Sequence, residues 1–432
     1  MFRHLHRRIF HREDPDSLWK NTDFLNLWGS ETISQFGSQI SLLAIPLLAA
    51  VTLDATPLEM GILGAAGGFP RLILGFLAGP WVDRHRKRPI MVLTDVGRAL
   101  VVLAIPVAAL LDHLSIGLLL VVATLIGMMS VYFNTAYTAI IPVLVQRRQL
   151  GDANGKLMSS YSLAQTAGPA IAGTLISLLS APVVMLVNCA TYLWSAWFLR
   201  HIRKPEPPPP ERARRHHFRQ EILDGFRVLV ASPILRATTT CSVAISLSGN
   251  IFLAVYVLYM TNDLHLSSSG IGLVYASGGI GSLLGTFVSS WFARKLGVGR
   301  TIVWSAIACG LLGMTVPLAI LVPDHALPLI VFAECFQWMT LMVHDVNRVS
   351  LRQALTPDHL QGRVSASTQA LYGGAQTLGL LAGGVVGDLF GVQVALIVGI
   401  AGMFAASWFV WASPTNEVRV MPAEPDPLFA TM

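Results

Sequence analysis

Residues 79–89 read GPWVDRHRKRP and place five charged side chains within the six positions 83–88. Long apolar runs lie directly before and after this stretch. A loop of a soluble protein scatters its charges, whereas the short cytoplasmic loops of membrane proteins gather Lys and Arg. The stretch therefore predicts a connection between two membrane spans, held on the cytoplasmic side.

The composition of the whole chain also predicts a membrane protein. The chain has 432 residues, of which 53% are hydrophobic and 12% are charged. A soluble domain carries about a quarter charged residues, so this chain lacks the polar material to cover its own surface. Several apolar runs reach about 20 residues, the length that crosses a hydrocarbon core about 30 Å thick.

Twelve such segments can be placed along the chain, and an even number puts both termini on one side of the membrane. We predict spans at 24–51, 57–82, 89–111, 115–145, 157–180, 182–200, 234–260, 268–293, 301–322, 327–350, 363–387 and 392–412. The predicted fold is therefore an all-α membrane protein.

The Lys and Arg residues are confined to alternate connections between these spans. They are Arg84, Arg86, Lys87 and Arg88; Arg147, Arg148 and Lys156; those from Arg203 to Arg227; Arg294, Lys295 and Arg300; and Arg352 and Arg363. The other connections, near Asp54, Asp112, Ala181, Asp263, Asp324 and Asp388, contain none. Because basic loops stay in the cytoplasm, we expect both termini to face the cytoplasm of a bacterial-type inner membrane. The formal charge of +6 then reports topology and not a nucleic-acid partner.

One long hydrophilic segment, HIRKPEPPPPERARRHHFRQ at 201–220, interrupts the chain near its midpoint. Its proline run should be extended, and its basic residues can rest on anionic lipid headgroups. A short amphipathic helix is expected at 218–230. We therefore divide the chain into a cytoplasmic tail (1–22), a six-helix bundle (23–200), a Pro/Arg-rich linker (201–233), a second six-helix bundle (234–412) and a second cytoplasmic tail (413–432).

The two bundles resemble each other at an offset of 210–211 residues. AQTAGPAIAG at 164–173 aligns with AQTLGLLAGG at 375–384, with five of ten positions identical. GFLAGPWVDR at 75–84 aligns with GTFVSSWFAR at 285–294 and keeps the leading Gly, the Trp and the Arg. Two halves in the same orientation form a parallel repeat, the arrangement of transporters that rock two bundles about a central site.

These residues resemble the major facilitator superfamily. Gly79, Asp83, Arg84, Lys87 and Arg88 are similar to that family's signature between spans 2 and 3. Segments 138–154 and 349–367 are similar to its twelve-span efflux branch, which includes macrolide, multidrug and enterobactin-type siderophore exporters. Gly168, Pro169 and Gly173 resemble the span 5 signature associated with antiporters, in which Pro169 can bend the helix. Span 4 departs from the family pattern, because it lacks the intramembrane Arg of many proton-coupled drug exporters.

The resemblance implies a gate at the opening stretch. In the family, the Asp at the end of span 2 meets the start of span 11, which here contains Arg363. A carboxylate is also stabilised at the positive end of a neighbouring helix. Breaking and remaking this contact would shift the protein between outward-facing and inward-facing states. The alternative is that the basic cluster only orients the loop.

Polar residues inside the spans are the candidates for a transport site, since a charge at mid-membrane costs about 2.5–3.5 kcal/mol and therefore usually faces a cavity or a partner. Burial raises the pKa of a carboxyl group, which permits reversible protonation near neutral pH. The candidates for proton coupling are Glu31, Glu334 and Asp345. The candidates for the substrate cavity are Gln35, Gln39, Asn134, Tyr137, Asn250, Tyr256, Trp338, Gln369 and Tyr372.

Three further charges, Arg71, Asp95 and Arg98, are interpreted as structural ion pairs. Asp95 and Arg98 lie one helical turn apart, and Arg71 could be held by Asp95 or by Glu31. Arg71 could instead attract an anionic group of the substrate. His344, near the cytoplasmic end of its span, is expected to face the surface.

The sequence predicts a secondary active transporter that exports an amphipathic small molecule, such as a drug, antibiotic or siderophore, by alternating access in exchange for protons. An importer or uniporter of a solute or lipid on the same fold is the alternative. No phosphate-binding loop, metal-ligand spacing or nucleophile motif is present, so we expect no enzymatic activity, no metal and no cofactor beyond a proton gradient. The expected partners are the small-molecule substrate, protons and membrane lipids, and the protein is expected to be a monomer.

Overall fold

The computed structural model describes residues 18–206, 218–422 and 426. Every regular element in these residues is a helix, so the predicted all-α class is confirmed. The predicted N-terminal tail lies outside the described residues except for 18–22, and so do the proline run and the end of the C-terminal tail.

Twelve long helices in the described residues correspond one by one to the twelve predicted spans. The first half comprises α2 (Thr22–Leu47), α3 (Pro57–Asp83), α4 (Lys87–Leu110), α5 (Ile116–Leu144), α6 (Leu150–Leu179) and α7 (Ala181–Arg200). The second half comprises α9 (Pro233–Leu258), α10 (Ser268–Leu296), α11 (Val298–Gly313) with the short α12 (Thr315–Leu318), α13 (Ala326–Leu355), α14 (Asp358–Phe390) and α15 (Val392–Trp411).

Ten of these helices are long and apolar enough to cross a membrane, and α3 makes an eleventh. α3 is bent by 58° between Pro57–Gly75 and Leu77–Asp83. α14 has the length of a span but is less apolar, because glycines and the glutamines Gln369 and Gln376 interrupt its apolar residues. The less apolar helix is therefore one that carries predicted cavity residues.

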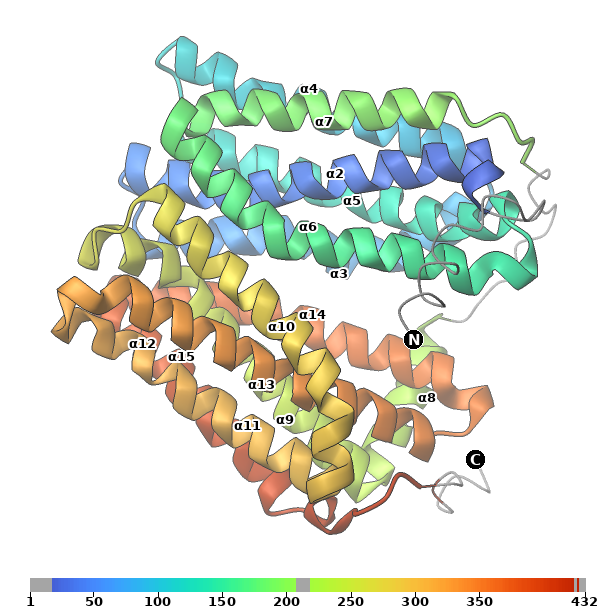
Figure 1. Cartoon of the computed structure of the whole chain (residues 1–432), viewed down its shortest axis with the longest axis vertical. Helices are drawn as coiled ribbons and strands as arrows, with labels where there is room; N and C mark the ends of the chain where they lie inside the picture. The colour runs from blue at the N-terminus through green and yellow to red at the C-terminus, as the bar shows by residue number, and fades with distance from the viewer. Residues whose placement is uncertain (1–17, 207–217, 423–425, 427–432) are drawn as a thin grey trace, which may run out of the picture.

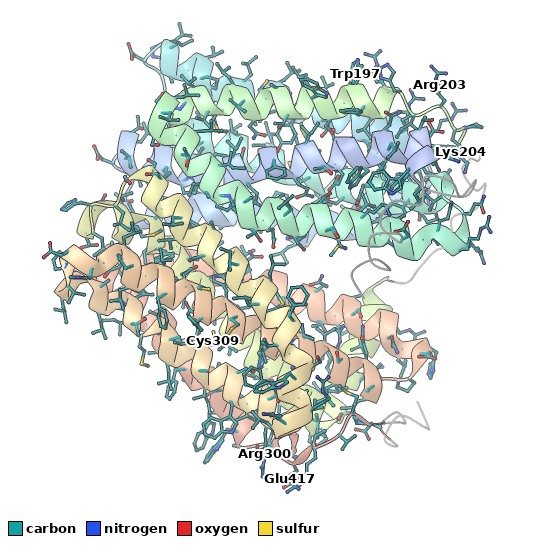
Figure 2. The ribbon with its side chains drawn as sticks, in the orientation of Figure 1. Trp197, Arg203, Lys204, Arg300, Cys309 and Glu417 are labelled. Atoms are coloured by element: carbon teal, nitrogen blue, oxygen red, sulfur yellow. The ribbon has the colours of Figure 1, made fainter. Side chains whose placement is uncertain are left out.

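The connections between the helices lie at two opposite ends of the molecule (Figure 1). We call them the acidic end, with the turns near Asp54, Asp112, Asp263, Asp324 and Asp388, and the basic end, where α2 begins and α15 ends, with the Lys- and Arg-rich connections. Figure 2 shows Arg203, Lys204 and Arg300 at the basic end.

The helix boundaries of the two halves repeat at a nearly constant spacing. Thr22 and Pro233 begin α2 and α9, and Pro57 and Ser268 begin α3 and α10, each pair 211 residues apart. The same spacing separates two π-helical segments, η2 (Leu48–Thr52) and η4 (Tyr259–Asp263), which end the first helix of each half. An irregularity kept at equivalent positions supports the internal repeat, and π-helical turns are frequent at functional sites.

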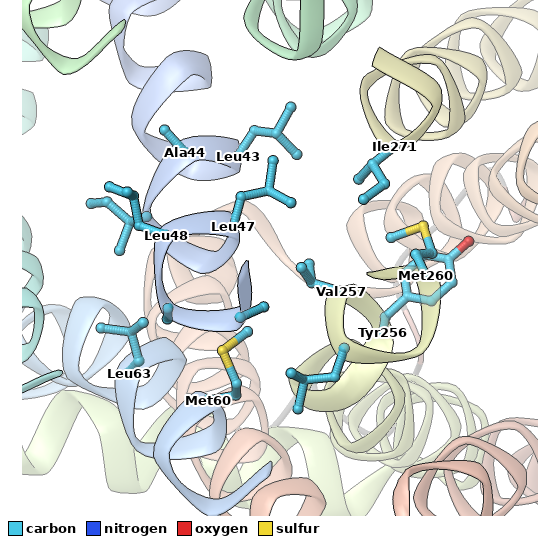
Figure 3. Close-up of a cluster of buried hydrophobic side chains, with 14 of the residues drawn as sticks. Leu43, Ala44, Leu47, Leu48, Met60, Leu63, Tyr256, Val257, Met260 and Ile271 are labelled. Carbon is cyan, nitrogen blue, oxygen red and sulfur yellow. The ribbon is translucent and has the colours of Figure 1, made fainter. Parts of the chain in front are cut away.

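The hydrophobic core joins the two halves at the acidic end only. One cluster contains Leu43, Leu47 and Met60 from the first half together with Val257 and Ile271 from the second (Figure 3). Towards the basic end the first half and the second half each have a separate cluster of their own. The halves are therefore packed together at one end and separate towards the other.

The glycines of the facing helices show the same change along the molecule. A Cβ atom added to Gly61 of α3 would lie 2.8 Å from the Cα atom of Gly384 in α14, and one added to Gly173 of α6 would lie 2.9 Å from the Cα atom of Gly272 in α10. Cβ atoms added to Gly79, Gly155 or Gly362, towards the basic end, would meet nothing within 4 Å. The helices of the two halves thus touch backbone to backbone near the acidic end, and the molecule opens towards the basic end.

The expected amphipathic helix at 218–230 corresponds to α8 (Phe218–Ala231). α8 packs along α14, where Gly225 lies against the backbone of Arg363. Val228 and Leu229 of α8 are buried. The helical part of the linker, α8, therefore packs against the second half before α9 begins.

Candidate functional site

A cavity of about 490 Å³ lies between the two halves. We call it the inter-half cavity. Arg71 and Leu72 of α3 form its wall on the first half, opposite Asn250 of α9 and Gln369 and Tyr372 of α14. Three helices from both halves therefore contribute polar groups to one space, as a transport pathway requires.

A second cavity of about 300 Å³ lies within the second half, and we call it the second-half cavity. Ser246, Asn250 and Tyr372 line both cavities, so the two adjoin. Its wall on α13 is a stripe at helical spacing, which follows the 3.6-residue period of a helix. The stripe consists of Glu334, Gln337, Trp338, Leu341, His344, Asp345 and Arg348.

Glu334 is held in this cavity by two neutral donors. The hydroxyl of Tyr256 donates to Oε2 at 3.0 Å, and the indole nitrogen of Trp338 donates to Oε1 at 2.8 Å. Glu334 is 4% exposed and Tyr256 is fully buried. The carboxyl group therefore faces the cavity without a cationic partner among the described residues.

Asp345, by contrast, pairs with a cation one turn along the same helix. The guanidinium of Arg348 donates to Oδ1 of Asp345 at 3.0 Å from Nη2 and 3.2 Å from Nε. Arg348 also lies over the ring of Tyr372, 5.0 Å from its centroid. This ion pair places both charges at the wall of the second-half cavity.

His344 does not face the surface as the sequence analysis expected, since it is only 1% exposed. Its Nδ1 hydrogen bonds to the carbonyl oxygen of Ile302 at 3.0 Å, and its Nε2 to the hydroxyl of Ser242 at 3.1 Å. The expectation was wrong because α13 continues to Leu355, so position 344 lies inside the helix bundle and not at its end. The spacing from Glu334 along the polar stripe is the signal that would have found it.

In the first half, Glu31 lies in the interior of α2 and is 5% exposed. The side-chain amide of Gln35, one turn along, donates to Oε1 at 2.5 Å. Oε2 has no hydrogen-bond partner among the described residues. Glu31, a candidate for proton coupling, and Gln35, a candidate for the substrate cavity, are therefore bonded to each other.

Asp95 and Arg98 form a buried ion pair on α4. The hydroxyl of Ser195 donates to Oδ2 of Asp95 at 2.6 Å, and the Arg98 guanidinium lies 4.3 Å from the ring centroid of Phe133. Arg71 is not part of this group: it is exposed and lines the inter-half cavity. The grouping of Arg71 with Asp95 or Glu31 is corrected accordingly, because Asp95 finds its cation one turn away on its own helix, whereas α3 directs Arg71 towards the second half.

The other predicted cavity residues divide between the halves. Asn250, Tyr256, Trp338, Gln369 and Tyr372 line one or both cavities. The first-half candidates line neither: Gln35 bonds to Glu31, Gln39 lies against Gly168, Tyr137 stacks on Phe133 and Asn134 is exposed. Tyr275 of α10, which the sequence analysis did not single out, lines the second-half cavity.

The gating motif surrounds the turn between α3 and α4. Gly79 lies in the last turns of α3, Asp83 is its last residue, Arg84 caps it, and Lys87 and Arg88 begin α4. The Glu206 carboxylate accepts from the backbone nitrogens of Lys87 and Arg88 at 2.5 and 2.9 Å, which caps the start of α4.

Asp83 and Arg363 are both exposed, and no ion pair joins them in the described part of the chain. The contact that the gate requires is therefore not made in this conformation.

The span 5 signature lies within α6, which continues as a helix through Pro169. Gly168 lies against the side chain of Gln39 from α2, and Gly173 lies against the backbone of Gly272 from α10. These glycines permit close approach of α6 both to its own half and to the other half.

Comparison with known proteins gives a consistent likeness over the whole chain. Residues 17–428 match the family model MFS_3, described as transmembrane secretion effector. The multidrug efflux pump Tap of Mycolicibacterium fortuitum is 27% identical, over 84% of this chain and 88% of its own length. The enterobactin exporter EntS of Escherichia coli is 25% identical over 81% and 83%, and the macrolide efflux protein A of Streptococcus pyogenes is 24% identical over 87% and 91%.

Solved structures share the fold at low sequence identity. A bacterial homologue of the iron transporter ferroportin in its inward-facing state superimposes with a TM-score of 0.73, at 16% identity, over 92% of this chain and 99% of that chain. A bacterial homologue of the human lysosomal transporter Spinster, also inward-facing, gives 0.68 at 15% identity over 94% and 98%. The predicted arrangement of two repeated helical halves is thus the fold of known transporters.

Proposed function

This chain belongs to the MFS_3 family of transmembrane secretion effectors within the major facilitator superfamily, and on that premise we propose that it exports an amphipathic small molecule by alternating access in exchange for protons. The observation that carries the proposal is a polar cavity between two halves that are sealed to each other at one end only. The efflux proteins among its relatives support the outward direction.

Alternating access requires a seal that can form at either end of the pathway. The seal at the acidic end consists of one apolar cluster shared by both halves and of glycine contacts between α3 and α14 and between α6 and α10. If the basic end faces the cytoplasm, as the distribution of Lys and Arg favours, this conformation is inward-facing and ready to take up substrate from the cytoplasm.

Glu334 is the residue that we propose to carry the proton. Its two partners, Tyr256 and Trp338, are neutral donors, so within the described part of the chain no cation fixes the charge of the carboxyl group. Asp345 suits the role less, because Arg348 compensates its charge. Glu31 remains a second candidate, because one of its carboxyl oxygens has no partner among the described residues.

The test uses purified full-length protein in inside-out proteoliposomes with an acidic lumen. A macrolide and enterobactin, the cargoes in the relatives' names, serve as probes. We expect the wild type to accumulate a probe in the lumen against its gradient as protons leave. Glu334→Gln should lower that accumulation to the level of protein-free vesicles, while exchange of the probe down its own gradient continues.

Glu417→Gln is the matched control, because Glu417 is exposed at the basic end (Figure 2) and lines neither cavity. A uniporter would equilibrate the probe without responding to pH. Uphill transport by the Glu334→Gln variant at the wild-type rate would exclude Glu334 as the carrier, and the same measurement on Glu31→Gln would then test the second candidate.

A further inference from the structure

Arg71 is a cation near the middle of a membrane-spanning helix. It stands fourteen residues after Pro57, the first residue of α3, or about 21 Å along the helix at about 1.5 Å per residue. The hydrocarbon core is about 30 Å thick, so Arg71 lies well inside it. Its side chain is exposed to the inter-half cavity and not packed into the bundle.

No anionic side chain compensates this charge among the described residues. The four carboxyl groups inside the helices are engaged elsewhere: Asp95 with Arg98, Asp345 with Arg348, Glu334 with Tyr256 and Trp338, and Glu31 with Gln35. A mid-membrane charge is costly unless it faces a partner or a wet cavity. The uncompensated charge of the inter-half cavity is therefore positive.

The groups opposite Arg71 are polar but uncharged. Asn250 donates through Nδ2 to the carbonyl oxygen of Ser246 at 2.7 Å, and its buried Oδ1 has no hydrogen-bond partner among the described residues. Gln369 and Gln376 of α14 add amide groups, and Leu72 adds apolar surface. The cavity thus offers one cation, neutral amides and an apolar wall.

We propose that Arg71 binds an acidic group of the transported molecule, which makes the substrate an amphipathic anion such as a carboxylate or an acidic phenol. This assignment rests on the proposed export function and specifies its substrate class. A guanidinium suits the role because its planar donors match an oxyanion.

The experiment compares two amphipathic probes of nearly the same shape and opposite charge, the carboxylate 4-phenylbutanoate and the ammonium 4-phenylbutylammonium. Their binding to the full chain in a non-ionic detergent is measured by titration calorimetry. We expect the wild type to bind the anion about tenfold more tightly than the cation. Arg71→Gln should remove most of that difference, and Arg71→Lys should retain much of it. Arg300→Gln, at an exposed position of the basic end (Figure 2), should leave it unchanged.

A wild-type protein that binds both probes equally, or prefers the cation, would overturn the assignment without recourse to any variant. An Arg71→Gln variant that keeps the full preference would also overturn it. If the wild type exports a probe in exchange for protons but Arg71→Gln keeps the wild-type charge preference, only the anion assignment is rejected. A preference that depends on Arg71, in a protein that never accumulates substrate against a pH gradient, would reject the export mechanism alone.

Discussion

The Asp95–Arg98 pair keeps two charges in the interior of the first half. Both side chains are at most 5% exposed, and Ser195 together with the rings of Phe133 and Tyr192 surrounds them. Removing one partner of a buried pair costs more than the pair itself contributes, because the remaining charge is left uncompensated. The two residues are therefore expected to act as a structural unit.

Asp95→Ala should lower the free energy of unfolding by about 3–5 kcal/mol, since Arg98 would remain buried without its carboxylate. The double variant Asp95→Ala/Arg98→Leu should recover much of that loss. Thermal unfolding of the purified protein measures both. Asp152→Ala is the control, because its side chain is 60% exposed in a pair with Lys156, and such surface pairs contribute about 0–1 kcal/mol. Equal losses from the two single variants would contradict the structural role.

Single residues show where sequence reasoning succeeds and where it stops. Asp95 and Arg98 could be paired from the sequence because they lie three positions apart on one helix face. The direction of Arg71 could not be predicted, because whether a residue of α3 faces α4 or α14 depends on the packing of helices far apart in the chain. The same limit explains why the first-half candidates Gln39 and Asn134 do not line either cavity.

The helices themselves were predictable in number and order, because each span is a long apolar run between polar connections. The first and last residues of the helices were less predictable. α6 begins at Leu150 and α13 ends at Leu355, whereas the expected spans began at 157 and ended at 350. The apolar pattern marks only the part of a helix inside the hydrocarbon, and these helices continue beyond it.

The glycine contacts at the acidic end determine how closely α6 can approach α10. A Cβ atom added to Gly173 would lie 2.9 Å from the Cα atom of Gly272, and at that distance the two backbones must move apart. Gly155 belongs to the same helix but has nothing within 4 Å. Substitutions at the two positions therefore distinguish a loosened contact between the halves from a change in the helix propensity of α6.

Gly173→Ala should weaken the seal and populate conformations in which the acidic end is open. Spin labels on His113→Cys and Asp324→Cys, introduced at the acidic end in a cysteine-free background, should report a longer inter-label distance. Gly155→Ala should leave the distance unchanged and raise stability by up to about 1 kcal/mol, because Ala is the better helix former. If both variants gave the same distance distribution as the wild type, the glycine contact would not control closure.

The conformation of the whole molecule determines which predicted contacts can be seen in it. The halves are joined at the acidic end and apart towards the basic end. Asp83 of α3 and the start of α14, which lie at the basic end in different halves, are therefore not in contact. Such a contact can form only when the basic ends come together. If the motif acts as a gate, its contact belongs to a state other than the one in this structure, so the gate stays a prediction.

Asp83→Asn should destabilise the state in which the basic end is closed, because the amide cannot replace the charge of the carboxylate. Loss of about 1 kcal/mol from one state changes the ratio of the two states about fivefold. Spin labels on Asn154→Cys and His359→Cys, at the basic ends of α6 and α14, should then show the long distance more often, and turnover should fall while probe affinity stays near the wild-type value. Asp388→Asn, an exposed position at the acidic end of α14, is the control for removing one charge. Unchanged turnover and distances in Asp83→Asn would leave the basic cluster with the single role of holding its loop in the cytoplasm.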